Sequence, residues 1–238
     1  QRYNLDYKDT HSPVTENTTF KLLLANSKRR NRRRMLIDFA GAFLYPLLKE
    51  EIYIKAPELY RGTGKVLKLL KTLYGLKQAS HEWNKLLTQV LKEMGFQQQA
   101  DDIDQCLFIH KEWDINMCVH VDDCLLDFSN IKNVEKMLKI LKERKFDYTE
   151  SEKFTKALGI RVEENENSIT LSQPNYVKIM LKDFELENCI EFDAPPTQWE
   201  SERSEDEESF DEGTYRSIIG CLAYLARMTR PDIEMYVF

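Results

Sequence analysis

Residues Met117 to Phe128 read Met-Cys-Val-His-Val-Asp-Asp-Cys-Leu-Leu-Asp-Phe, two apolar runs that meet at a pair of adjacent carboxylates. The runs have the length and bulk of two short strands joined by a tight polar turn. Such a hairpin would hold Asp122 and Asp123 at the rim of a sheet. Neighbouring carboxylates repel each other unless a cation lies between them, and oxygen ligands suit a hard ion such as Mg²⁺. Asp is also common in turns for purely local reasons, so the pair alone leaves a structural role open.

A second apolar stretch upstream, Met35 to Leu44, carries a single carboxylate at Asp38. A two-metal phosphoryl-transfer site takes carboxylates from separate strands, because its ions lie about 3.5–4 Å apart and contact both the attacking and the leaving oxygen. Asp38 is therefore the candidate third carboxylate. Between the two stretches, Tyr74 and Gly75 form a turn-like pair before an amphipathic helix, and a glycine there can let a nucleotide approach the backbone.

Seven blocks of the sequence follow one another in a recognisable order and spacing. They are Asp6–Val14, Asp38–Leu44, Glu50–Ile54, Leu73–Ala79, Val119–Asp123, Leu158–Ile160 with Leu171–Gln173, and Tyr215–Gly220 with Thr229–Ile233. In this order the blocks resemble the reverse transcriptase of Ty1/copia-type LTR retrotransposons, and the resemblance covers nearly the whole chain. Seven ordered blocks are far more specific than any one of them.

The resemblance implies an RNA-directed DNA polymerase. Asp38, Asp122 and Asp123 would be the catalytic and metal-binding carboxylates, with Phe39 beside Asp38 in the metal-binding set. The implied cofactor is a pair of Mg²⁺ ions, for which Mn²⁺ is an alternative. The implied partners are an RNA or DNA template-primer and deoxynucleoside triphosphates, joined by attack of the primer 3′-hydroxyl on the α-phosphate.

The resemblance also implies substrate-binding residues outside the carboxylate set. Phe43 falls where the family has an aromatic steric gate against the ribose 2′-hydroxyl, and Tyr74, Gly75 and Gln78 fall in the block that contacts the incoming nucleotide. The pair Leu158 and Gly159 matches the turn that grips the primer terminus. Aromatic side chains pack in cores more often than they bind substrates, so the roles of Phe43 and Tyr74 depend on their place in the matched blocks.

The sequence departs from the family pattern at several positions. His120 replaces the usual Tyr before Val-Asp-Asp, which keeps a ring there but allows a positive charge below about pH 6.5. Ser80 replaces the usual Pro. The run from Lys28 to Arg34 holds six cations in seven residues, and it is open to three interpretations: a nuclear address, a phosphate-binding patch, or a solvated turn between a helix and a strand.

The periodicity predicts an α+β fold. Helices are expected over 18–26, 78–94, 134–144, 174–186 and 215–228, and strands over 35–39, 51–55, 65–70, 105–110, 115–121, 124–128, 154–163 and 168–171. The order strand, helix, two strands, helix, strand indicates the split βαβ arrangement of ferredoxin-like folds, an antiparallel sheet with helices on one face. Asp38 would then lie on a strand adjacent to that of Asp123.

The resemblance divides the chain into five regions. They are a remnant of the fingers with a lead-in helix (1–33), a polymerase palm (34–164), a thumb-like strand and helix (165–199), an acidic disordered linker (200–212) and a helical segment leading toward ribonuclease H (213–238). We expect most of the fingers and the ribonuclease H domain to be missing. On this expectation the chain alone extends a primer weakly or not at all, and the competing hypothesis is an inactive retrotransposon remnant that at most binds nucleic acid.

Composition narrows the class of protein further. With 42% hydrophobic and 31% charged residues in 238 positions, the chain can form a core and has no apolar run of the length that a membrane span needs. Five cysteines without paired metal spacing indicate reduced core thiols. The net charge is −6, but residues 200–212 alone carry −7, so the remainder is close to +1. We expect an intracellular protein, cytoplasmic with access to the nucleus, of unknown oligomeric state.

Overall fold

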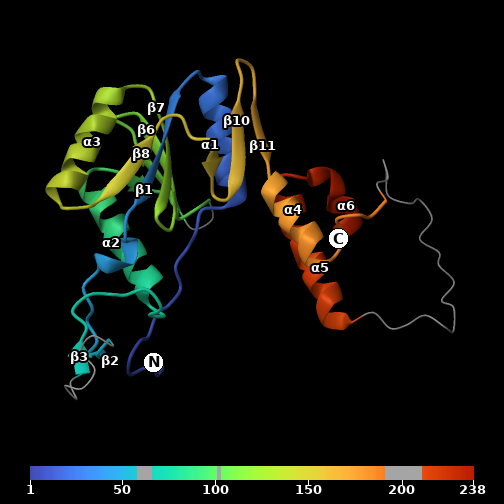
Figure 1. Cartoon of the computed structure of the whole chain (residues 1–238). Coiled ribbons are helices and arrows are strands. Elements are labelled where there is room, and N and C mark those ends of the chain that lie inside the picture. The colour runs from blue at the N-terminus through green and yellow to red at the C-terminus, as the bar shows by residue number, and fades with distance from the viewer. Residues whose placement is uncertain (58–65, 101–102, 191–210) are drawn as a thin grey trace. The chain divides into compact units, whose positions relative to one another are not determined.

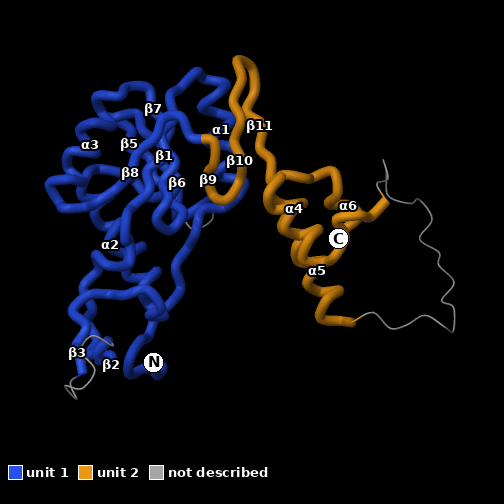
Figure 2. The backbone as a smooth tube through the Cα atoms, in the orientation of Figure 1, with its two compact units in different colours: residues 1–154 blue, residues 155–238 orange. Residues whose placement is uncertain are grey.

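The computed structural model describes residues 1–57, 66–100, 103–190 and 211–238. They form two compact units, 1–154 and 155–238, which Figure 2 shows in two colours. The boundary at residue 154 lies ten residues before the expected end of the palm at 164. All but the last two residues of the expected linker 200–212 lie outside the described residues.

The first unit is built on a six-stranded antiparallel sheet with the strand order β4-β5-β6-β7-β1-β8. Its strands are β1 (Arg33–Phe39), β4 (Gln97–Gln98), β5 (Leu107–His110), β6 (Ile115–His120), β7 (Asp123–Phe128) and β8 (Tyr148–Ser151). Its helices are α1 (Asn17–Arg29), η1 (Ala42–Leu44), α2 (Ala79–Glu93) and α3 (Ile131–Glu143). A separate hairpin pairs β2 (Tyr53–Lys55) with β3 (Val66–Lys68).

The predicted α+β class and antiparallel sheet are confirmed. The elements β1, α2, β6, β7, α3 and β8 follow one another in the chain, and their strands take the order β6-β7-β1-β8, which is the split βαβ topology. The last strand was predicted wrongly: it is β8, whereas the predicted strand 154–163 is divided between other elements. The sequence Tyr-Thr-Glu-Ser of β8 is mostly exposed and lacks the apolar alternation that identifies a strand.

The main core lies between the sheet and helices α2 and α3. Alternate residues of the strands point into it, among them Ile37, Phe39 and Cys124, and α2 contributes Trp83 and Leu91. This alternation follows from the two-residue period of a strand. The core therefore covers one face of the sheet.

Helix α1 lies against β6 and β7 on the opposite face, as Figure 1 also shows. The cross-strand partners Cys118 and Leu125 are buried although they point away from the main core, and α1 buries Phe20 and Leu24. The expectation of helices on one face is therefore wrong. One apolar stripe on α1 cannot by itself show which face of the sheet it covers.

Gly95 ends α2 in a left-handed conformation, with φ of 98°. The amide of Phe96 donates to the Leu91 carbonyl and that of Gly95 to the Lys92 carbonyl, each over 3.0 Å, which is a Schellman cap. A Cβ at Gly95 would lie 3.0 Å from Nε2 of His110.

We therefore expect Gly95→Ala to lower the free energy of unfolding by about 1–3 kcal/mol, measured by urea denaturation. Gly220→Ala is the matched control, because Gly220 lies in a helix with no atom within 4 Å of an added Cβ. The control should raise stability by up to about 1 kcal/mol. Equal effects of the two variants would contradict the assignment of strain to Gly95.

The second unit contains a three-stranded antiparallel sheet, β9 (Lys156–Ala157), β10 (Ile160–Glu164) and β11 (Ile169–Ser172), followed by helices. The helices are α4 (Pro174–Asp183), α5 (Glu212–Met228), η3 (Pro231–Ile233) and α6 (Glu234–Val237). Asp211 caps α5, because its carboxylate accepts from the Thr214 amide over 2.8 Å. Among the described residues, no helix is long and apolar enough to cross a membrane.

Candidate functional site

Asp38 near the end of β1 and Asp123 at the start of β7 face each other across neighbouring antiparallel strands. The amide of Phe39 donates to the Asp122 carbonyl over 3.0 Å, so Asp38 and Asp123 form a non-hydrogen-bonded pair. In such a pair the Cα atoms are only about 4.5 Å apart and both side chains lie on one face of the sheet. Because Ile37 and Phe39 point into the main core, the two carboxylates point to the other face.

The turn between β6 and β7 is strained. It consists of Val121 and Asp122, and Val121 has φ of 58°, a conformation that is an outlier for a β-branched residue. Trp83 holds this turn, because its indole Nε1 donates to the Val121 carbonyl over 2.6 Å. The Trp83 ring is buried and packs edge-on against Phe39, with 5.3 Å between centroids. Helix α2 thus fixes the backbone that carries the paired carboxylates.

Sequence reasoning placed Trp83 only among the apolar positions of its helix and missed this hydrogen bond. A buried Trp usually has a hydrogen-bond acceptor for its N–H, so the residue type alone predicts that Trp83 donates a hydrogen bond. The acceptor is a main-chain carbonyl, however, and the sequence pattern cannot identify such a partner before the fold is known.

Asp38 and Asp123 place carboxylate oxygens on one face of the sheet. Oxygen ligands of this kind suit a hard cation such as Mg²⁺. Within the ranges that the structure describes, no three His, Cys, Asp or Glu side chains are grouped so as to hold a metal ion. The structure therefore brings together the Asp38 and Asp123 pair, with Asp122 in the adjoining turn, but does not gather the three carboxylates into one preformed group.

His120 pairs across the hairpin with Asp123. Burial lowers the pKa of the His120 imidazole, and the negative charge of Asp122 opposes this effect only partly. Its Nδ1 atom is buried without a hydrogen-bond partner among the described residues. The ring is therefore neutral at neutral pH, and a positive charge beside the carboxylates requires a lower pH than an exposed histidine would.

The predicted nucleotide-binding residues are an aromatic pair, a glycine and a glutamine with a buried side-chain amide. The rings of Phe43 in η1 and Tyr74 lie 4.9 Å apart, and Tyr74 is exposed. Gly75 has φ of 92°, and an added Cβ would meet nothing within 4 Å. Gln78 is buried, and its side-chain amide donates to the Asp6 carbonyl over 2.9 Å. The structure thus brings Phe43 and Tyr74 together, whereas the Gln78 side chain is hydrogen-bonded to the N-terminal segment.

Leu158 and Gly159 form the two-residue turn between β9 and β10 in the second unit. Both have positive φ, 51° and 76°, as a tight type I′ hairpin turn requires. The prediction of one continuous strand through these residues is therefore wrong, because a left-handed pair reverses the chain. The expected turn at Leu158 and Gly159 is present, whereas its role toward a primer stays a prediction.

Two arginines of the basic run, Arg32 and Arg33, form ion pairs within the first unit. The Arg32 guanidinium donates to Asp114 over 2.7 Å and to Asp127 over 2.9 Å, and Arg33 pairs with Glu152. The hydrogen bond from Arg32 holds the pKa of Asp114 below its usual range.

Of the three interpretations of the basic run, the solvated turn between a helix and a strand agrees with the structure, because Arg30 and Asn31 are exposed between α1 and β1. The ion pairs of Arg32 and Arg33 were missed, because their acidic partners lie far away in the chain.

Three of the five cysteines lie in the core. Cys106, Cys118 and Cys124 are buried, and burial raises the pKa of the Cys118 thiol to about 12, so this thiol stays protonated. Cys189 is exposed and Cys221 half-buried, and all five are free. The prediction of reduced core thiols is therefore right for three cysteines and wrong for Cys189.

Comparison with known proteins identifies the family. A family model described as reverse transcriptase (RNA-dependent DNA polymerase) matches residues 1–198. The chain is 31% identical to the Retrovirus-related Pol polyprotein from transposon RE1 of Arabidopsis thaliana, 27% identical to that from transposon TNT 1-94 of Nicotiana tabacum, and 24% identical to the Transposon Ty1-H Gag-Pol polyprotein of Saccharomyces cerevisiae. These matches cover 100%, 98% and 99% of the chain but only 16%, 18% and 14% of the polyproteins. The chain belongs to the reverse transcriptase family of Ty1/copia-type Pol polyproteins.

Proposed function

We propose that this chain carries the polymerase site of an RNA-directed DNA polymerase, in which Asp38, Asp122 and Asp123 hold two Mg²⁺ or Mn²⁺ ions. The observation that supports the proposal best is the pairing of Asp38 with Asp123 on one face of the sheet, beside a strained turn that a buried tryptophan holds. Strained backbone is retained mainly where function requires it. The divalent ions, when bound, would activate the primer 3′-hydroxyl and stabilise the charge on the α-phosphate.

The residues of the chain would do the positioning. Asp38 and Asp123 would bind the ions from two strands, and the hydrogen bond from Trp83 would hold the turn that carries Asp122. Positioning supplies much of the catalysis in phosphoryl transfer. Phe39 lies next to Asp38, and its amide is already bonded to the Asp122 carbonyl, which couples the two carboxylate strands.

The proposal extends to the regions of the chain. We assign 34–164 to a palm, 165–199 to a thumb-like segment, and the turn at Leu158 and Gly159 to the primer grip. The partners would be an RNA or DNA template-primer and deoxynucleoside triphosphates, substrates that the reverse transcriptase family implies.

The test is Mg²⁺-dependent extension of an oligo(dT) primer on poly(rA). It should be made with the purified chain and with a chimaera in which the chain replaces the matched segment of the Ty1-H polyprotein. We expect the chimaera to extend the primer and the chain alone to do so weakly or not at all. Extension should stop on removal of Mg²⁺ and return with Mn²⁺. If both proteins are folded and bind the template-primer but extend nothing, the alternative of an inactive remnant that binds nucleic acid is favoured.

Phe43→Ala tests the steric-gate assignment. The ring lies 4.9 Å from the ring of Tyr74, and removing it opens space where a ribose 2′-hydroxyl would collide. We expect incorporation of ribonucleotides to rise by about tenfold or more relative to deoxynucleotides, measured as the ratio of kcat/KM values. Tyr74→Ala is the control for general loosening of the pair. If Phe43→Ala leaves the ratio of the two kcat/KM values unchanged, Phe43 is not the steric gate.

A further inference from the structure

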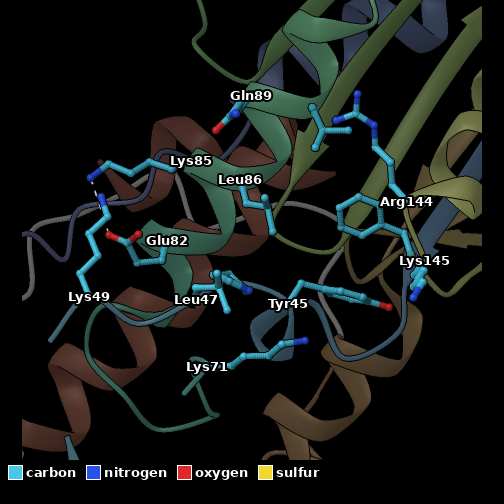
Figure 3. A pocket seen from close by; sticks show the side chains of 13 residues that line it. Tyr45, Leu47, Lys49, Lys71, Glu82, Lys85, Leu86, Gln89, Arg144 and Lys145 are labelled. Atoms are coloured by element: carbon cyan, nitrogen blue, oxygen red, sulfur yellow. Dashed lines mark ion pairs between the residues drawn. The ribbon is translucent and has the colours of Figure 1, made fainter. Parts of the chain in front are cut away.

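A cavity of about 720 Å³ lies on the outer side of α2, between that helix, the segment after η1 and the segment after α3 (Figure 3). A second cavity of about 560 Å³ shares Lys85 and Gln89 with it and continues along α2 to Lys92. We call the two together the α2 groove. Each volume is within the range of ligand sites. The shared residues make the groove elongated rather than a single pocket.

The floor of the groove is apolar and aromatic. It includes Tyr45, Leu86 and Phe146, and the rings of Tyr45 and Phe146 lie 4.9 Å apart. The Tyr45 hydroxyl accepts from the Asp147 amide over 2.7 Å, which holds the ring in place. Figure 3 shows Tyr45 reaching across the cavity toward the segment of Arg144 and Lys145. A fixed, partly buried ring of this kind can carry a stacked base.

The rim of the groove is strongly cationic. Six of its lining residues carry positive charge and two carry negative charge: Lys49, Lys71, Lys85, Lys92, Arg144 and Lys145 against Glu82 and Glu93. Glu82 lies 3.7 Å from Lys85, and Glu93 pairs with Arg144 over 2.5 Å. No carboxylate in the described part of the chain pairs with the other four lysines. An excess of positive charge therefore remains in a chain whose net charge is −6.

The α2 groove is distinct from the carboxylate site. Helix α2 turns Trp83, Leu87 and Leu91 toward the sheet. Its polar groove residues Glu82, Lys85 and Gln89 lie on another side of the helix. Asp38 and Asp123 lie on the sheet face that points away from α2. The helix and the sheet therefore separate the groove from the proposed polymerase site.

We infer that the α2 groove binds a single strand of nucleic acid, with phosphates on its lysines and a base against Tyr45. The positive charges come from four separate segments and extend along a continuous groove, as a chain of phosphates requires. A positive groove with an aromatic platform is the usual basis of strand binding without sequence preference. This inference goes beyond polymerisation and does not depend on it.

The test is fluorescence anisotropy of a labelled oligothymidylate across a salt series, comparing two triple variants of the full chain. The variant Lys49→Gln/Lys71→Gln/Lys145→Gln removes three groove lysines for which the described residues supply no acidic partner. Each phosphate contact to a single strand adds about 0.7 to the salt slope, so the slope should fall by about two. We expect binding at about 0.1 M salt to weaken roughly tenfold or more.

The matched control is Lys111→Gln/Lys132→Gln/Lys136→Gln, which removes three exposed lysines elsewhere in the first unit. It changes the net charge equally and should weaken binding less than about threefold. Equal losses in both triple variants would mean diffuse attraction and overturn the inference. An unchanged salt slope in the groove variant, or competition by dTTP as strong as that by the strand, would also overturn it.

Two further measurements keep the test independent of folding and of the polymerase site. If the groove triple variant has an altered circular dichroism spectrum, the single variant Lys71→Gln serves instead, with an expected fall in slope of about 0.7. An oligonucleotide that carries 5-iodouracil should crosslink to Tyr45 on irradiation. Crosslinks found only on the carboxylate face would overturn the inference.

Discussion

Replacing Asp123 with asparagine is expected to reduce Mg²⁺-dependent primer extension about a thousandfold. Asn keeps the shape of the side chain but removes the charge that holds a metal ion. If the ion contributes about 4 kcal/mol to the transition state, its loss corresponds to roughly three powers of ten in rate. The measurement is the single-nucleotide extension rate at saturating template-primer, in the chain or chimaera that shows activity.

Glu135→Gln is the matched control, because it removes one negative charge from the exposed side of α3. Extension should stay within about twofold of the unchanged protein. A second readout does not require activity: Mn²⁺ titration followed by electron paramagnetic resonance should show weaker binding to Asp123→Asn and Asp38→Asn, and unchanged binding to Glu135→Gln. Full activity of Asp123→Asn would exclude the proposed carboxylate site.

Arg32→Met is expected to produce the largest loss of stability, about 3–5 kcal/mol, because it leaves a buried carboxylate without its counterion. Asp127 is only 2% exposed, and its remaining described partner is Asn116, whose amide donates over 2.6 Å. Urea denaturation followed by tryptophan fluorescence would measure the loss.

Arg33→Met controls for the charge change, because Arg33 pairs with Glu152 on the surface, where both side chains are at least 40% exposed. Exposed ion pairs contribute about 0–1 kcal/mol. The double variant Arg32→Met/Asp127→Leu should recover part of the loss, since no buried charge remains. A double variant less stable than Arg32→Met alone would show that packing, not charge, makes the pair important.

The hairpin that carries Asp122 and Asp123 could be predicted from sequence because its two strands are apolar and its turn is short. The same reasoning placed Asp38 on an adjacent strand, and the register of β1 and β7 agrees with that placement. The hairpin was predicted from a local pattern of buried strands, which is the clearest signal in a sequence. The adjacency of the two strands was predicted from the order of the elements.

Other features depended on contacts that no local pattern records. Strand β8 has no apolar alternation, so its pairing with β1 is visible only in the fold. The break at Leu158 follows from a left-handed turn in a residue that rarely adopts one. The ion pairs of Arg32 join segments far apart in the sequence, and the apolar stripe of α1 fits either face of the sheet.

The two outer strands of the six-stranded sheet have a consequence for association between copies. Strand β4 contains only Gln97 and Gln98, and β8 places Glu150 within a largely exposed strand. Short or charged edge strands offer a poor template for pairing with the edge of another sheet. Both edges of this sheet, as described for the first unit, therefore disfavour edge-to-edge pairing with a second copy. At high concentrations of the chain, this lowers the tendency to aggregate through the sheet.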